Sequence, residues 1–116
     1  MTIDERRAEL LAKHCTTKPK VVAWGDLEFD LAALPGWKVE GKSIEKEFTF
    51  KDHYETIAFV NAIAQISHRE NHHPDLAVGY NKVVVVYTTH DAAEITENDF
   101  ICAAKVNASA SPTKAA

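Results

Sequence analysis

Residues 37–50 read WKVEGKSIEKEFTF, and their pattern is the clearest local indication of the fold. A Gly-Lys pair at positions 41 and 42 separates two short runs and suits a two-residue hairpin turn with glycine first. After this turn, apolar and polar residues alternate over residues 43–50, as in a strand that buries one face. Lys46 is the exception on the apolar face. The segment therefore predicts two antiparallel strands joined by a tight turn.

A helix is predicted directly after this hairpin. Asp52 and Glu55 stand three residues apart, which is the spacing of an aspartate version of the capping box that begins a helix. From there to about residue 68, apolar residues recur at the spacing of one helix face. The members of this stripe are Ala58, Phe59, Ala62, Ile63 and Ile66. We expect this helix to be the central one of the domain.

A second hairpin is predicted from residues 75–80 and 82–89. Its second strand contains the run Val83–Val86, and such a continuous β-branched run is typical of a strand that is covered on both faces. One face is expected to meet the helices. Because a small domain has few helices to spare, we predict that another subunit covers the other face. The chain is thus expected to form a homo-oligomer, either a dimer or a tetramer.

Shorter helices are predicted on both sides of these elements. Residues 4–13 form a candidate helix, and three leucines spaced i, i+4, i+7 favour another over residues 26–34. Thr96 is expected to cap a last helix. The predicted order is helix-strand-strand-helix-strand-strand-helix. This order indicates the α+β class, with a four-stranded antiparallel sheet and helices packed on one face.

The length of 116 residues suits one domain. We divide the chain into a partly helical N-terminal segment (1–25), a folded domain (26–106) and a flexible tail (107–116). The tail is predicted because its sequence, NASASPTKAA, consists of small and polar residues.

Charge and composition argue against several classes of partner. The formal net charge is −4 and the basic residues are scattered, so no nucleic-acid partner is expected. No apolar run is long enough to cross a bilayer, and the first residues lack the apolar centre of a signal peptide. The two cysteines, Cys15 and Cys102, form no metal-type C-x-x-C pair and indicate no disulfide framework. We therefore expect a cytoplasmic protein without a membrane partner.

Histidines are concentrated around the second hairpin. His72 and His73 precede its first strand, and His90 follows its second strand. If residues 81 and 82 form the turn, His73 lies directly opposite His90; a turn at residues 80 and 81 shifts the partner by two. With either register, residues before the first strand and after the second meet at the same rim of the sheet. Three imidazoles at one rim favour proton transfer, because the pKa of histidine lies near the operating pH.

A metal site is the competing interpretation of these histidines. His68 and His72 are spaced i, i+4, as in the H-E-x-x-H motif of zinc proteases. In that motif a glutamate follows the first histidine, whereas here Arg69 follows it. Glu70 lies about 200° around the helix from the first histidine. Acid–base chemistry without a metal is therefore the preferred hypothesis.

Several motifs together resemble the pterin-4a-carbinolamine dehydratase family. The resemblance spans roughly residues 34–106, and the adjacent His-His-Pro followed by Thr-His is its most specific part. The matching motifs are Gly36-Trp37, Phe50-Lys51-Asp52, His72-His73-Pro74, Tyr80-Asn81-Lys82-Val83, Thr89-His90 and Asn98-Asp99-Phe100-Ile101. The fold of that family, a four-stranded antiparallel sheet backed by helices, agrees with the predicted order of elements.

The resemblance implies a lyase reaction in tetrahydrobiopterin biosynthesis and cofactor recycling. Such a dehydratase converts 4a-hydroxytetrahydropterin to quinonoid dihydropterin and water, in support of an aromatic amino acid hydroxylase. It uses neither a metal nor an organic cofactor. By the family pattern, the acid–base residues are His72, His73 and His90. The residues that would bind and shape the pterin site are His68, Pro74, Thr88, Thr89 and Asp91.

Two positions depart from the family pattern. The family usually has an acid four residues before the histidine pair, where this chain has His68, and often an aromatic residue where this chain has Leu76. The sequence assigns no histidine as the acid or as the base. A non-catalytic dimerisation or interaction module on the same scaffold is the alternative function, because animal members of the family also bind a homeodomain transcription factor. The intact set of three histidines favours the enzyme.

Overall fold

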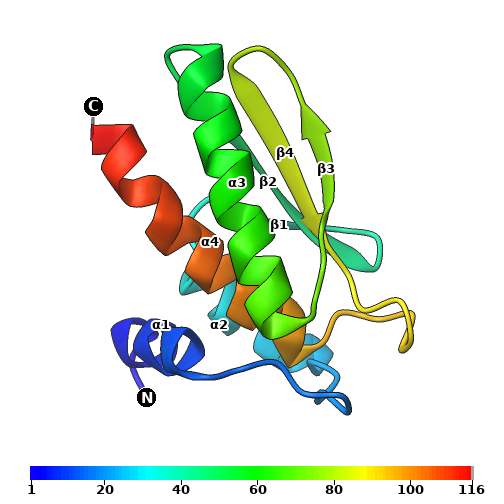
Figure 1. Ribbon diagram of the computed structural model, residues 1–116. Coiled ribbons are helices and arrows are strands. Elements are labelled where there is room, and N and C mark those ends of the chain that lie inside the picture. The colour runs from blue at the N-terminus through cyan, green and yellow to red at the C-terminus, as the bar shows by residue number, and fades with distance from the viewer. Residues whose placement is uncertain (116) are drawn as a thin grey trace.

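The computed structural model describes residues 1–115, and it describes side chains as far as residue 110. This part of the chain contains four helices and one four-stranded sheet (Figure 1). The elements are α1 (Ile3–Ala12), α2 (Trp24–Ala32), β1 (Lys38–Glu40), β2 (Ser43–Thr49), α3 (His53–Glu70), β3 (Asp75–Val78), β4 (Lys82–Tyr87) and α4 (Glu97–Ala115). No helix within these residues is both long and apolar enough to span a membrane.

The sheet confirms the predicted α+β class. Its strands are antiparallel and lie in the order β1-β2-β4-β3. The first hairpin turns at Gly41, whose φ of 62° lies in the left-handed region that glycine adopts without strain. Val39 is paired with Ile44 across this turn. The alternation in residues 43–50 therefore does mark a strand with one buried face.

The core lies between the sheet and the helices that cover one of its faces (Figure 1). Tyr87 of β4 and Phe48 of β2 point into this core and are at most 3% exposed. The Phe59 ring of α3 lies 4.7 Å from the Phe48 ring, and the Trp37 ring lies 6.0 Å from the Tyr87 ring. Aromatic pairs at these centroid distances add stabilisation beyond their buried area. The sheet face opposite α3 carries the polar positions of β2.

Helix α3 begins as the sequence predicts, with one difference in its cap. The Asp52 side chain accepts a hydrogen bond from the Glu55 backbone N–H at 2.9 Å. The Glu55 carboxylate accepts from the Lys51 N–H at 3.3 Å, so the reciprocal bond of a capping box goes to the preceding residue. The helix continues two residues past the expected end and stops at Asn71, whose φ of 51° is left-handed.

The preferred register of the second hairpin is wrong, and the alternative with a turn at residues 80 and 81 is correct. Val78 is paired with Val83, and the Gly79 N–H donates to the Lys82 carbonyl at 2.8 Å. Contacts from outside the hairpin stabilise this turn. The Tyr80 carbonyl accepts from the Thr56 hydroxyl of α3, and the Asn81 carbonyl accepts from the Phe50 N–H. The local sequence contains no signal of these partners.

Strand β3 is the exposed edge of the sheet. Leu76 and Val78 are 37% and 45% exposed, although they lie on the same face as the buried side chains of β4. On the opposite face, Val84 and Val86 are half-buried within a single chain. Apolar side chains on both faces near this edge are consistent with cover by a second subunit. The homo-oligomer stays a prediction.

The tail expected to start at residue 107 does not begin there, because α4 continues to Ala115. The Asn107 side chain accepts hydrogen bonds from Trp37 Nε1 and from Lys46 Nζ, both at 2.9 Å. Ala110 is 1% exposed and belongs to the core. These contacts hold the next helical turn, and they explain how Lys46 is accommodated on the apolar face of β2. The side chains of residues 111–115 and all of residue 116 lie outside the described part of the chain.

The N-terminal residues pack against the same core. Leu10 of α1 is fully buried. Arg6 forms a bidentate pair with the buried Asp30 of α2 and also contacts Glu97 of α4. The bond to Asp30 is the largest contribution to raising the pKa of Arg6 above its ordinary value. One arginine thus links three helices.

Residues 13–22, which we call the strap, connect α1 to α2 and cross the ends of α3 and α4. The Cys15 N–H donates to the Glu70 carboxylate at 2.7 Å. The backbone of Thr16 both donates to and accepts from the Asn98 side chain, at 3.1 and 2.8 Å. Further on, the Glu97 N–H donates to the Lys20 carbonyl at 2.8 Å. The strap is therefore held to both helix ends along its length.

Replacement of Gly36 by alanine is expected to lower the free energy of unfolding by about 1–3 kcal/mol. Gly36 has a φ of 89°, and an added Cβ would lie 2.6 Å from Cε of Lys46, whose ammonium group is held by the Pro35 carbonyl. Gly25→Ala is the matched control, because Gly25 is helical and has open space around it. That change is expected to be neutral or to stabilise the fold by up to about 1 kcal/mol. Urea denaturation of the two variants would contradict this account if both lost the same stability.

Candidate active site

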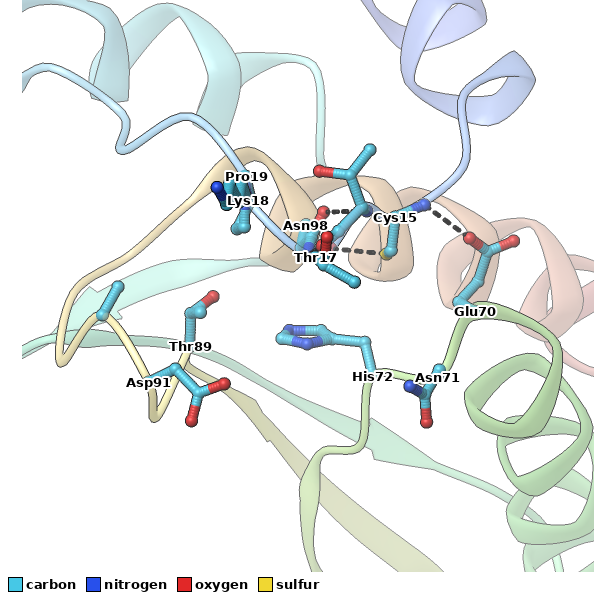
Figure 2. Close-up of a pocket in the computed structure, with 12 residues that line it drawn as sticks. Cys15, Thr17, Lys18, Pro19, Glu70, Asn71, His72, Thr89, Asp91 and Asn98 are labelled. Carbon is cyan, nitrogen blue, oxygen red and sulfur yellow. Dashed lines mark hydrogen bonds between the residues drawn. The ribbon is translucent and has the colours of Figure 1, made fainter.

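His72 is positioned by the end of α3. Asn71 turns the chain out of the helix, and the His72 N–H donates to the Ser67 carbonyl at 3.3 Å. The imidazole then lies parallel to the Tyr87 ring, with centroids 5.7 Å apart and an interplanar angle of 9°. Figure 2 shows this imidazole between the strap on one side and Thr89 with Asp91 on the other. Its side chain is only 12% exposed.

The fully buried carboxylate of Asp99 holds the His72 ring through a hydrogen bond. Oδ1 of Asp99 lies 2.6 Å from Nε2 of His72. Oδ2 of Asp99 accepts from the Thr89 hydroxyl at 3.0 Å and from the Thr96 N–H at 2.8 Å. The hydroxyls of Thr89 and Thr96 also contact each other at 2.6 Å. Both carboxylate oxygens are therefore satisfied, and the carboxylate cannot easily rotate away from the imidazole.

This arrangement determines which nitrogen of His72 carries the proton. An ionised carboxylate only accepts hydrogen bonds, so the Asp99 contact places the proton on Nε2 of His72. In the neutral ring, Nδ1 then has the free lone pair. A carboxylate in this position also stabilises the imidazolium formed when Nδ1 takes up a proton. The pair therefore has the geometry of an oriented general base.

The structure brings all three predicted histidines to one cavity, which we call the histidine cavity. It has a volume of about 220 Å³ and lies at the rim where β3 begins and β4 ends. Its lining residues are Asn71, His72, His73, Thr88, Thr89, His90 and Asp91. His73 and His90 are exposed, in contrast to the enclosed His72. Two solvated imidazoles and one oriented imidazole thus share a small space.

The loop after β4 presents His90. The Thr89 N–H donates to the Glu94 carbonyl at 3.2 Å, and the Ala93 N–H donates to the His90 carbonyl at 3.2 Å. Ala93 adopts a left-handed φ of 51°, which is uncommon for a residue with a Cβ. With the observed register, His73 continues opposite position 88 and not opposite His90. The turn of this loop, and not strand pairing, brings His90 to the cavity.

His68 and Pro74 do not line the histidine cavity. His68 is exposed on α3, where it lines a separate shallow depression with Ala64, Gln65 and Arg69. Because α3 ends at Glu70, His68 and His72 do not lie on one helical face as the metal hypothesis requires. Among the described residues, no three His, Cys, Asp or Glu side chains are grouped as a metal ion needs.

A larger cavity lies next to the histidine cavity and is closed on one side by the strap. This strap cavity has a volume of about 440 Å³, within the range of roughly 300–1,000 Å³ that is common for ligand sites. It shares Asn71, His72, Thr89 and Asp91 with the histidine cavity. Strap residues 15–19 form its opposite wall (Figure 2). His72 therefore faces a space large enough for a small ring system.

Glu70 anchors the strap and makes no hydrogen bond with His72, His73 or His90. Burial acts to raise the pKa of Glu70, but the hydrogen bond from the Cys15 N–H, the contact with His14 and the nearby Lys105 outweigh it and hold the pKa below its ordinary value. The Glu70 carboxylate therefore makes its hydrogen bonds with residues of the strap. The acid that orients His72 is Asp99, which follows it by 27 residues.

Sequence reasoning missed three parts of this site. Asp99 belongs to a motif that resembles the dehydratase family, but no spacing rule connects it to His72. The sequence gives no indication that the strap forms a wall of the site, because the polar contacts of the strap are with Glu70 and Asn98 in distant helices. Tyr87 was predicted only as part of a strand, whereas its ring supports the His72 imidazole.

The fold and cavity define an α+β protein with a histidine-lined site at one rim of an antiparallel sheet. A family model described as pterin 4 alpha carbinolamine dehydratase matches residues 25–109. This chain belongs to that family. The match extends over both hairpins, α3 and most of α4, and so includes every residue of the histidine cavity.

Relatives of known sequence agree with this assignment. A protein of Nitrosospira multiformis is 64% identical over 74 residues, which cover 64% of this chain and 66% of that protein. A protein of Bdellovibrio bacteriovorus is 48% identical over 106 residues, with 88% of each chain covered. Both carry pterin-4-alpha-carbinolamine dehydratase as a provisional name.

Solved structures share the fold. A transcriptional coactivator/pterin dehydratase from Brucella melitensis has a TM-score of 0.75 and is 33% identical; the match covers 78% of this chain and 99% of that one. A pterin dehydratase-like protein identified as a RuBisCO assembly factor in the alpha-carboxysome has a TM-score of 0.55 and is 25% identical, with 64% and 86% covered. The same scaffold is therefore associated with names that describe both catalysis and assembly.

Proposed function

We propose that this protein dehydrates 4a-hydroxytetrahydropterin to quinonoid dihydropterin and water, and so helps to recycle the tetrahydropterin cofactor of an aromatic amino acid hydroxylase. One observation carries the proposal above all. His72, His73 and His90 line one cavity, and the buried Asp99 orients the first of them. A scaffold used only for binding has no need of an imidazole held in this way.

The reaction requires one base and one acid. A proton leaves a ring nitrogen of the pterin, the C4a–O bond breaks, and the hydroxyl departs as water after it receives a proton. In the proposal, His72 is the base, because Asp99 keeps its Nε2 protonated and its Nδ1 free. His73 or His90 then protonates the departing hydroxyl, since both line the same cavity and are open to solvent.

The remaining cavity residues are proposed to shape the pterin site. Thr89 and Asp91 line both cavities and therefore lie where a bound ring would extend from one to the other. The Thr88 hydroxyl donates to the Lys42 carbonyl at 2.6 Å, so Thr88 acts as support for the rim. Pro74 keeps the chain extended after His73. His68 makes no contribution in this arrangement within one chain.

The test of this function is an assay with carbinolamine generated in situ by an aromatic amino acid hydroxylase. Catalysis by side chains alone predicts that prolonged treatment with a chelator leaves the full rate. Metal analysis of the purified protein is expected to find no stoichiometric zinc. Activity that is lost with the chelator and restored by zinc would instead support a metal-dependent mechanism.

An interaction module is the second candidate function. It is favoured by the names of two solved relatives, one a transcriptional coactivator/pterin dehydratase and one an assembly factor. The exposed side chains of Leu76, Val78 and Tyr80 near the edge strand offer an apolar surface to a partner. The two functions differ in one requirement, because only catalysis depends on the histidine cavity.

The exposed edge strand β3 predicts that the chain associates with copies of itself. Strand β3 has unpaired backbone groups along one side, and the neighbouring Leu76 and Val78 are 37% and 45% exposed. We expect light scattering at micromolar concentration to report a dimer or a tetramer. Leu76→Lys should lower the assembly state, whereas Glu28→Lys, at an exposed position of α2 and not on the sheet, should not. A stable monomer of the unmodified chain would refute this prediction.

A further inference from the structure

The two cysteines of the chain meet beside the candidate active site. Sγ of Cys15 lies 3.6 Å from Sγ of Cys102, although the residues are 87 positions apart in the sequence. Cys15 belongs to the strap and Cys102 to α4, and both are free thiols. A disulfide has an S–S distance of about 2.05 Å, so the sulfurs would have to approach by roughly 1.5 Å.

The two thiols differ in their access to solvent. Cys102 is fully buried, whereas Cys15 is half-buried and lines the strap cavity. The hydrogen bond from Cys15, together with burial, raises the pKa of the Cys102 thiol. A soluble oxidant can therefore reach Cys15 through the cavity, and only Cys15 can reach Cys102. An accessible thiol that reacts first and a buried thiol that resolves the mixed disulfide are the two parts of a reversible redox pair.

We propose that Cys15 and Cys102 form a reversible thiol–disulfide site that links the strap covalently to α4. The oxidant is a low-molecular-weight disulfide. The Cys15 thiolate attacks one sulfur of this disulfide, its S–S bond breaks, and one thiolate leaves with the electron pair. Cys102 gives its proton to that thiolate and attacks Sγ of Cys15, which expels the second small thiolate; this thiolate takes up the proton that Cys15 released on ionising. Two protein thiols are oxidised, and one small disulfide is reduced to two thiols.

Two neighbours of the thiol pair, the strap and Tyr87, connect it to the cavities. The strap carries Thr16 to Pro19, which form a wall of the strap cavity (Figure 2). On the other side is Tyr87, whose ring stacks on His72. Burial raises the pKa of Tyr87 and the nearby Cys102 adds to this rise. Oxidation of Cys102 therefore changes the surroundings of the Tyr87 ring, which stacks on the proposed base.

The test uses the full chain and oxidised glutathione, and it does not depend on pterin turnover. Wild-type protein is expected to end without bound glutathione, with a mass lower by the two hydrogen atoms lost and with one cross-linked peptide that contains both cysteines. Dithiothreitol should reverse this. Cys102→Ala is expected to stop at a mixed disulfide of glutathione with Cys15, because the resolving thiol is gone. Cys15→Ser should not react, because Cys102 is buried.

A second measurement follows the strap itself. A cross-link that closes so long a loop is expected to raise the melting temperature by at least about 5 °C. It should also slow tryptic cleavage after Lys20, in the strap, relative to the reduced protein. Cys102→Ser keeps a side chain of similar size without the thiol and replaces the alanine variant if that variant does not fold.

Two outcomes would overturn the proposal. In one, wild-type protein retains glutathione on Cys15 as the Cys102→Ala variant does, which would show that the second thiol never resolves the first. In the other, neither protein reacts, and the two sulfurs are then only a packing contact.

Discussion

His72→Ala is expected to lower kcat/KM for carbinolamine dehydration by about 10²–10⁴-fold, the range typical of a well-placed general base. The substitution removes the one imidazole that is both enclosed and oriented by a buried carboxylate. Because the dehydration also proceeds slowly in water, a measurable residual rate should remain. Stopped-flow absorbance of quinonoid dihydropterin formation would measure the loss.

Single replacements of His73 and His90 are expected to reduce kcat/KM as well. Residues that act as one unit lose activity non-additively, so the His73→Ala/His90→Ala double variant should be little worse than the poorer single variant. His53→Ala is the control, since His53 contacts the Tyr80 carbonyl at the opposite end of the hairpin. His68→Ala is a second control on the exposed face of α3. Wild-type turnover by the double variant would remove His73 and His90 from the mechanism.

Asp99→Asn is expected to lower kcat by about 10²-fold or more with little change in KM, by analogy with orienting aspartates in catalytic triads. The amide oxygen can still accept from Thr89 and Thr96, so its NH₂ group turns toward Nε2 of His72. The imidazole must then accept at Nε2 and carry its proton on Nδ1. In that tautomer Nδ1 has no lone pair for the substrate. Asp99 is a positioning residue in this account.

A buried carboxylate elsewhere in the chain provides the matched control. Asp30 is 4% exposed, pairs with Arg6 of α1, and lines neither the histidine cavity nor the strap cavity. Asp30→Asn is expected to lower stability and leave kcat unchanged. If Asp99 acts only on stability, both variants should behave alike and the pH profile of kcat should keep its wild-type shape. A changed pH profile in Asp99→Asn alone is the result that a positioning role predicts.

The elements were predictable wherever the determining contacts are local. Alternation in residues 43–50, the glycine turn at Gly41 and the cap at Asp52 each involve neighbours within a few positions, and the structure has all three. The register of the second hairpin was not predictable, because Thr56 of α3 fixes the turn from 24 residues away. The last turns of α4 likewise depend on contacts of Asn107 with residues of the first hairpin and with Trp37.

The candidate site was likewise predictable only where it depends on local structure. Hairpin topology places His72, His73 and the loop that carries His90 at one rim, although the predicted register was shifted, and the turn of that loop then brings His90 to the cavity. The Asp99 partner of His72 and the strap wall both depend on tertiary packing between elements distant in sequence. No periodicity or local spacing in the sequence records such contacts. The family resemblance did indicate Asp99, but without its role.

Dehydration of a pterin carbinolamine in the histidine cavity can be measured without a coupled cellular system. The most direct measurement mixes purified wild-type protein with freshly generated 4a-hydroxytetrahydropterin and records the appearance of quinonoid dihydropterin. The account predicts a saturable rate well above that of buffer, and a rate close to that of buffer for the His72→Ala/His73→Ala/His90→Ala variant. A wild-type rate equal to that of buffer, from protein that is folded, would contradict it and leave the interaction module as the better explanation.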